Sequence, residues 1–176
     1  MPQQVAPRAL DKLANGRVAL GPFSLVVPAN WQEKPSTSNM RAAEFQVMSD
    51  TGKAEVIVYY FGESGAGTVQ DNVDRWLNQF KQEDGKASRE VAKIEHTKFA
   101  GQDADVVSVS GHYVAPAMPG GEAVDKPDQA LLAAIVGSPH GPYYFRLVGD
   151  RSAVAAQTAA FQQLLGTLEL RSSKPE

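Results

Sequence analysis

Short runs of apolar residues that follow one another through turn-forming residues constrain the fold of this chain most. Alternation predicts strands over residues 23–27 and 41–48, and residues 54–61 are apolar on both faces, as is typical of a central strand. The turn-forming residues 50–52 favour a hairpin between the last two strands. Trp31 follows Pro28, which ends the first strand, and leads into a polar stretch over residues 32–39.

The second half of the chain shows the same pattern. Strands are predicted over residues 91–99 and 104–114, and the turn between them places His96 opposite about Asp105. Two more strands, 131–137 and 143–148, flank the turn 138–142, and a short last strand is predicted at 167–170. Residues 115–129 are rich in Pro, Gly and Ala and predict a long irregular segment of the kind that often carries function.

Two helices are predicted among these strands. The first begins after Thr68, an N-cap residue with Asp71 three positions later as in a capping box, and ends before residues 84–85. Its apolar stripe consists of Val69, Val73, Trp76, Leu77 and Phe80. The second helix runs from Asp150 or Ser152 to Gly166, and weak periodicity suggests a short helix over residues 8–13.

This element order predicts an α+β fold with a mostly antiparallel sheet of about six to seven strands flanked by helices, as in an α/β/α sandwich. Consecutive strands joined by short turns are the reason to expect antiparallel pairing. We expect an N-terminal extension over residues 1–20, a single α+β domain over 21–171 and a polar tail over 172–176.

Composition excludes several classes of function. A net charge of -3 provides no basic field for nucleic acid, and no stretch approaches the roughly 20 apolar residues of a transmembrane segment. The absence of cysteine excludes disulfides, thiolate metal sites and cysteine nucleophiles. No residue pattern indicates a cofactor or a metal, so we assign no cofactor-binding, metal-binding or catalytic residues.

The glycine-rich loop 62–68 lies between a buried strand and a helix, where free backbone N–H groups attract anions. It lacks the Lys-Ser/Thr pair of a P-loop and the spacing of a dinucleotide-binding loop, and Glu63 and Asp71 would repel phosphate. A strand-to-helix turn is therefore the main interpretation, with Gly65 and Gly67 supplying its freedom. An anion site is the alternative.

Two arginines and an asparagine complete the candidate binding surface. Arg75 lies four residues after Asp71, so an ion pair on the helix surface explains it, and the neighbouring Trp76 is expected in the core. Arg146 lies inside an apolar strand, where a salt bridge is the default and contact with an anion or partner is the alternative. The candidate surface residues are Gly65, Gly67, Asn72, Arg75 and Arg146.

The three histidines do not form a recognisable site. His96 and His112 lie on two arms of one hairpin in a register that keeps them apart, so no shared metal is expected. His140 lies in an exposed turn. A Ser138–His140 dyad with a distant aspartate stays open, although no Gly-x-Ser-x-Gly motif supports it.

Three local motifs resemble the Mog1/PsbP-like fold, and the resemblance covers about residues 20–170. They are Pro22-Phe-Ser-Leu-Val-Val-Pro28-Ala-Asn-Trp31, the strand-loop-helix unit 56–80 with Asn72-Val-Asp-Arg-Trp76, and Tyr143-Tyr-Phe-Arg-Leu-Val-Gly149. The chain is also similar to uncharacterised bacterial proteins of that fold, which are often exported or lipid-anchored. Mog1 proteins bind a small nuclear GTPase and PsbP proteins serve photosystem II, but their partner-binding residues match no positions here.

The resemblance implies a non-catalytic binding or accessory domain of a bacterial envelope protein, with an unknown protein partner or a small anionic ligand. We expect its contact surface near loop 62–68, the start of the first helix and segment 115–129. Export is expected, with the leader absent from this chain, and a cytoplasmic location is the alternative. A hydrolase using Ser or Asp with His140 or His112, and a structural oligomer subunit, are the other functions considered.

Overall fold

The computed structural model describes residues 8–36, 40–47, 50, 52–116 and 123–171. Its larger sheet is antiparallel throughout, and β6 (Ala54–Tyr60) lies inside it, as the apolar pattern on both faces predicts. On one side of β6 lie β5 (Arg41–Val47) and then β4 (Trp31–Lys34). On its other side follow, in order, β11 (Tyr143–Asp150), β10 (Val124–Val136), β9 (Gln102–Ala115) and β7 (Phe80–Lys81). Strand β8 (Lys93–Phe99) also pairs with β9.

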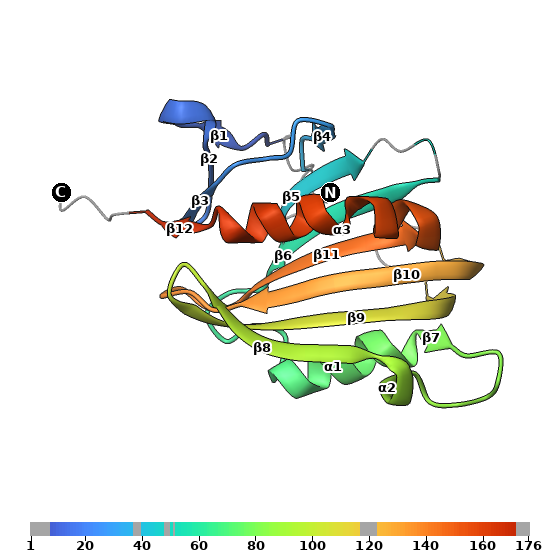
Figure 1. Cartoon of the computed structure of the whole chain (residues 1–176). Coiled ribbons are helices and arrows are strands. Elements are labelled where there is room, and N and C mark those ends of the chain that lie inside the picture. Colours follow the sequence, from blue (N-terminus) through green and yellow to red (C-terminus); the bar gives the residue numbers. More distant parts are fainter. Residues whose placement is uncertain (1–7, 37–39, 48–49, 51, 117–122, 172–176) are drawn as a thin grey trace, which may run out of the picture.

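A second, four-stranded sheet packs beside the first (Figure 1). Its strands are β1 (Asp11–Lys12), β2 (Val18–Leu20), β3 (Phe23–Leu25) and β12 (Glu169–Leu170). The helix expected over residues 8–13 is wrong, because Asp11 and Lys12 pair with β2 and a 3-10 turn follows at Ala14–Gly16. A helix of six residues has few hydrogen bonds to offset its nucleation, whereas pairing with β2 satisfies the same backbone groups.

In the described residues three α-helices accompany the sheets: α1 (Val69–Asn78), α2 (Ser88–Val91) and α3 (Arg151–Gly166). The α+β class is confirmed. In the described residues, however, the main sheet has eight strands instead of six to seven, and a second sheet packs where an α/β/α sandwich would have helices. The long α3 packs on β10 and β11, whereas the short α1 packs on β7 and β9 (Figure 1).

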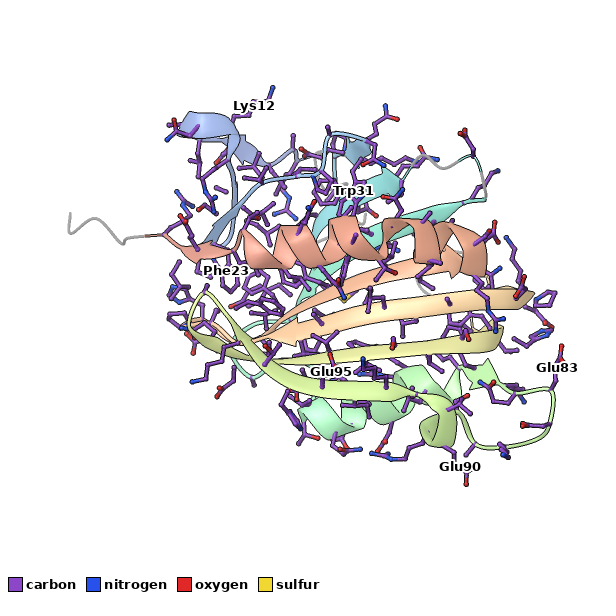
Figure 2. The ribbon with its side chains drawn as sticks, viewed as in Figure 1. Lys12, Phe23, Trp31, Glu83, Glu90 and Glu95 are labelled. Atoms are coloured by element: carbon purple, nitrogen blue, oxygen red, sulfur yellow. The ribbon has the colours of Figure 1, made fainter. Side chains whose placement is uncertain are left out.

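The main sheet buries a core on each face. Phe145 and Leu147 point toward α3 and the small sheet, and Tyr144 points toward α1, as the two-residue period of a strand requires. Phe23 and Trp31, both buried, lie on the α3 side, whereas charged residues such as Glu83 lie at the periphery (Figure 2).

Helix α1 covers only part of its face of the sheet. The apolar residues packed with α1 come from β9, β10 and β11, and the same face continues over β4, β5 and β6 with polar side chains. On β6, Glu55 is exposed between the buried residues Ala54 and Val56. This half of the face is where a cleft forms.

Several local predictions are confirmed. The hairpin of β5 and β6 and that of β8 and β9 form, and the latter has His96 opposite Asp105 as expected. Thr68 and Asp71 form the capping box of α1, with the Asp71 N–H donating to Thr68 Oγ1 at 3.0 Å.

Other local predictions are corrected by tertiary contacts. Residues 31–34 form a strand because Trp31 is buried in the core and pairs with Val47 of β5. Segment 115–129 is strand at Ala115 and again from Val124, while residues 117–122 lie outside the described part. Phe80 leaves the helix for β7, and Val69 is exposed instead of lying on the buried stripe.

Candidate binding site

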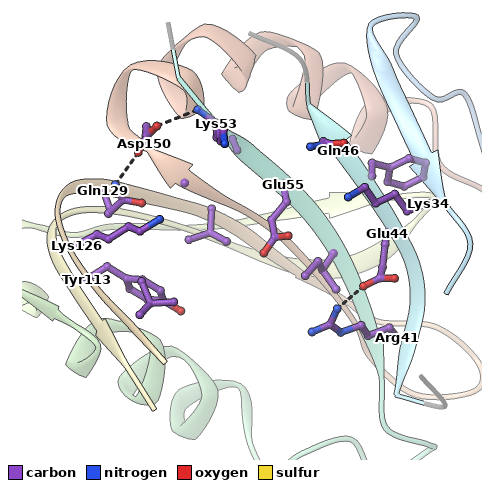
Figure 3. Close-up of a pocket in the computed structure, with 16 residues that line it drawn as sticks. Lys34, Arg41, Glu44, Gln46, Lys53, Glu55, Tyr113, Lys126, Gln129 and Asp150 are labelled. Carbon is purple, nitrogen blue, oxygen red and sulfur yellow. Dashed lines mark hydrogen bonds and ion pairs between the residues drawn. The ribbon is translucent and has the colours of Figure 1, made fainter. Parts of the chain in front are cut away.

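A cleft of about 470 Å³ lies on the half of the sheet face that α1 leaves uncovered (Figure 3). One side is formed by β4, β5 and β6, and the other by the ends of β9, β10 and β11. Four basic and three acidic side chains contribute to its lining. The lining residues are Lys34, Arg41, Glu44, Phe45, Gln46, Lys53, Ala54, Glu55, Ile57, Tyr113, Val124, Lys126, Gln129, Val148, Gly149 and Asp150.

A β-bulge in β10 builds one wall of the cleft. The register with β9 shifts between Lys126 and Gln129, and Asp128 has a φ of 56°. Pro127 has no N–H to donate to a ladder, which makes the bulge a suitable place for it. Gln129 is buried and donates through Nε2 to the Pro127 carbonyl at 3.2 Å and to Asp150 Oδ1 at 2.8 Å.

Asp150 joins this wall to β6. Its Oδ2 accepts the N–H of Lys53 at 2.9 Å, and its own N–H donates to the Lys53 carbonyl at 2.9 Å. The hydrogen bond from the Lys53 backbone, and then that from Gln129, lowers the pKa of Asp150 below its ordinary value. Although Asp150 precedes α3, its side chain makes no capping hydrogen bond to the helix, and its oxygens accept from Lys53 and Gln129.

Arg41 closes the other end of the cleft. Its Nη1 is paired with Glu44, and its guanidinium carbon lies 5.9 Å from the ring centroid of Tyr59. Burial acts to lower the pKa of Arg41, but Glu44 and the charges around it outweigh that effect and raise the pKa. Arg41 and Glu44 therefore form an ion pair that adds no net charge to this end of the cleft.

The structure places Gly65, Gly67, Asn72 and Arg75 outside the cleft lining. Asn72 is buried and donates from Nδ2 to the carbonyls of Ala66 and Thr68 at 3.1 and 2.9 Å, which ties the glycine-rich loop to α1. A Cβ at Gly65 would lie 2.6 Å from Tyr144 Oη, so the loop packs closely on β11. These contacts give the loop a structural role, and a binding role for it stays a prediction.

Arg75 does not pair with Asp71 as its spacing suggests. Its Nη2 instead donates to Asn72 Oδ1, while Asp71 takes part in the capping box. Trp76 is in the core as expected, with an exposed fraction of 5%.

Arg146 lies between Ala133 and Ile57 on neighbouring strands, and its guanidinium carbon is 5.4 Å from the ring centroid of Trp76. Within the described residues it has no carboxylate partner, so the expected salt bridge is not present. Its Nε and Nη2 are buried without a hydrogen-bond partner. The indole face offsets part of the cost of this burial.

The histidines lie apart from one another and from the cleft. His96 pairs with Asp105 on β9, and His112 pairs with Asp125 across β9 and β10. At the turn, Ser138 Oγ accepts the N–H of His140 at 3.1 Å and donates to the Gly141 carbonyl at 2.6 Å. The Ser138 hydroxyl therefore stabilises the turn and does not meet the imidazole.

Sequence reasoning missed the cleft, although one signal points to it. On β5, Glu44 and Gln46 share a face and alternate with the buried residues Ala43, Phe45 and Val47. The same alternation on β6 places Glu55 beside them. A polar face on two strands deep in a sheet indicates a surface that no helix covers.

In the described ranges no group of three or more His, Asp or Glu side chains is arranged to hold a metal ion. None of the described helices combines the length and the apolarity needed to span a bilayer.

Comparisons with known proteins identify a fold and no family. No family model matches the chain, and neither does any curated protein. The solution structure of PsbP (CyanoP) from the cyanobacterium Synechocystis sp. PCC 6803 matches with a TM-score of 0.51 at 12% identity, over 95% of this chain and 94% of that one. The chain therefore has the PsbP-like fold that its motifs predict.

Two further solved structures have lower scores. The protein of unknown function PA94 from Pseudomonas aeruginosa has a TM-score of 0.49 and 16% identity, over 96% of this chain and 100% of that one. LpqN, involved in cell envelope biogenesis of Mycobacterium tuberculosis, has a TM-score of 0.49 and 11% identity, over 85% and 83%.

Proposed function

We propose that this chain is a non-catalytic binding or accessory domain of a bacterial envelope protein, and that the open cleft is its binding site. The observation that carries the proposal is the cleft itself, a concave site of about 470 Å³ on the main sheet. That volume lies in the range of roughly 300–1,000 Å³ typical of small-molecule sites. The PsbP-like fold supports an accessory role, and the motif resemblance to exported bacterial proteins supports the envelope.

The cleft is built for binding more than for reaction. Two of its three carboxylates, Glu44 and Asp150, are held by Arg41, Gln129 and the Lys53 backbone, so neither is placed as a free general base. The third, Glu55, is exposed. The apolar floor formed by Ile57 and Val148 offers contact area. Fixed polar groups around an apolar floor provide orientation and affinity together.

Because the chain contains no cysteine, a single introduced thiol can report on one site. We would label Gln46→Cys in the cleft and Lys12→Cys on the small sheet with an environment-sensitive dye and screen a chemically diverse fragment library. Saturable emission changes at position 46, without changes at position 12, are the expected result. Responses confined to position 12, or absent at both, would refute the cleft as the binding site.

The hydrolase alternative is tested separately with a panel of ester, amide and phosphate substrates. We expect no saturable turnover from the purified protein. Turnover that disappears in His140→Ala or His112→Ala would show an enzyme and contradict the non-catalytic part of the proposal.

A further inference from the structure

Three lysines border the cleft. Lys34 is on β4, Lys53 immediately precedes β6, and Lys126 lies at the bulge of β10, so the three come from separate parts of the sheet (Figure 3). Within the described part of the chain none of them forms an ion pair. By contrast, Lys93 on the edge strand β8 pairs with Glu95 at 3.0 Å.

The carboxylates of the cleft neutralise these lysines only in part, and, after the backbone hydrogen bond from Lys53, the charges of Lys126 and Lys53 contribute to the lowered pKa of Asp150. Glu44 is paired with Arg41, and both oxygens of Asp150 accept hydrogen bonds from Lys53 N and Gln129. Glu55 is the third lining carboxylate, and it is exposed. Once the Arg41–Glu44 pair is set aside, three basic side chains face two acidic ones, although the whole chain has a net charge of -3.

The floor between these charges is apolar. Ile57 and Tyr113 are buried, with exposed fractions of 6% and 8%, and both line the cleft. Val148 of β11 also lines it. An inorganic ion would leave this surface wet, and a neutral apolar molecule would leave the lysines unpaired. Complementarity to both features requires an acidic group joined to an apolar body.

We propose that the cleft binds a small organic anion, with its carboxylate or phosphate attracted by the positive charges of Lys34, Lys53 and Lys126 around the rim and its apolar part on Ile57 and Val148. The ammonium groups act as point charges on flexible stems, so they accept either acid without demanding one geometry. This assignment deepens the proposed function and rests on it, since it names the class of ligand for the same site.

Calorimetric titration with four matched probes tests the class of ligand. 1-Naphthyl phosphate and 1-naphthoate combine an acid with an apolar body, 1-naphthol has only the apolar body, and inorganic phosphate has only the charge. We expect at least one naphthyl anion to bind about tenfold tighter than both single-feature probes, as expected for charge-assisted contacts added to apolar burial. The stronger of the two anions identifies the acid that the site prefers.

Charge-matched variants test the residues. Lys34→Gln, Lys53→Gln and Lys126→Gln together should weaken binding of the better naphthyl anion about tenfold or more. The control combines Lys12→Gln, Lys86→Gln and Lys98→Gln, which change the net charge equally at exposed positions outside the cleft lining. It should retain affinity within about twofold, because distant exposed charges are screened by salt.

Several outcomes would overturn the assignment. Equal losses in the two triple variants would indicate a general field effect, and naphthol binding as tightly as the anions would show that the lysines do not select the ligand. Binding of an acidic peptide, with no binding of either naphthyl anion, would favour a protein partner instead. If neutral fragments still change the dye at position 46, the proposed function survives and only the ligand class fails.

Discussion

The guanidinium of Arg146 lies over the indole of Trp76, with its Cζ 5.4 Å from the ring centroid, while its Nε and Nη2 are buried without hydrogen-bond partners. A cation–π contact contributes about 0.5–2 kcal/mol. Each unsatisfied buried donor costs about 1–3 kcal/mol, so the desolvation of this side chain outweighs the stacking.

Replacing Arg146 with an apolar side chain of similar length should therefore stabilise the protein. We expect Arg146→Met to raise the free energy of unfolding by about 1 kcal/mol, as buried ion-to-apolar replacements often do. Urea denaturation measures the change. A loss of more than 1 kcal/mol would instead show that the guanidinium holds a bound water or anion that stabilises the fold.

Gly65 should be far more sensitive to substitution than Gly62 in the same loop. Both have positive φ, 67° and 89°, but a Cβ at Gly65 would lie 2.6 Å from Tyr144 Oη, whereas Gly62 faces open space. Gly62→Ala should cost about 1 kcal/mol from backbone strain, and Gly65→Ala about 2 kcal/mol more from the clash. Equal losses in thermal or urea unfolding would contradict the close packing of the loop on β11.

Asn72 should contribute to stability through its hydrogen bonds to the loop. Asn72→Ala removes the amide that serves the carbonyls of Ala66 and Thr68, and we expect a loss of about 2 kcal/mol in urea denaturation. Asn78, which is exposed at the end of α1, supplies the matched control. Asn78→Ala should change the free energy of unfolding by less than about 0.5 kcal/mol.

Asp150 should stabilise the fold in a pH-dependent way. Its folded-state pKa lies below the ordinary 3.8, so its contribution is present above that value and is lost as pH falls through the lower folded-state pKa. We expect Asp150→Asn to be less stable than the parent at pH 7, and the difference to shrink as the pH falls below 3.8. A difference that stays constant between pH 7 and pH 2.5 would show that the ionised carboxylate is not the stabilising form.

Local signals in the sequence predict local structure well. The two arms around residues 100–103 fix the register that places His96 opposite Asp105, because a tight turn leaves little choice of pairing. The capping box of Thr68 and Asp71 is likewise encoded within four residues. Such features depend on neighbours in the chain and need no knowledge of the sheet.

The cleft depends on the order of the strands in the sheet, which cannot be read from short stretches of the sequence. Lys34, Glu55 and Lys126 line one cleft only because β4, β5 and β6 are consecutive in the sheet and β6 pairs with β11, which in turn pairs with β10. The sequence around Pro127 looks like a loop, yet tertiary pairing carries the strand through a bulge there. Local patterns in the sequence likewise favour the glycine-rich loop as a binding site, whereas its contacts in the structure hold it against β11 and α1.

The most direct test of the binding site is a map of backbone amide shifts in the ¹⁵N-labelled protein on addition of a fragment mixture that includes 1-naphthyl phosphate. We expect the largest shifts in β5, in β6 and at Gln129, around the cleft. If the largest shifts instead fell in loop 62–68 and at the start of α1, with no shifts in β5 and β6, the cleft would not be the binding site. That result would favour the contact surface expected from the sequence alone.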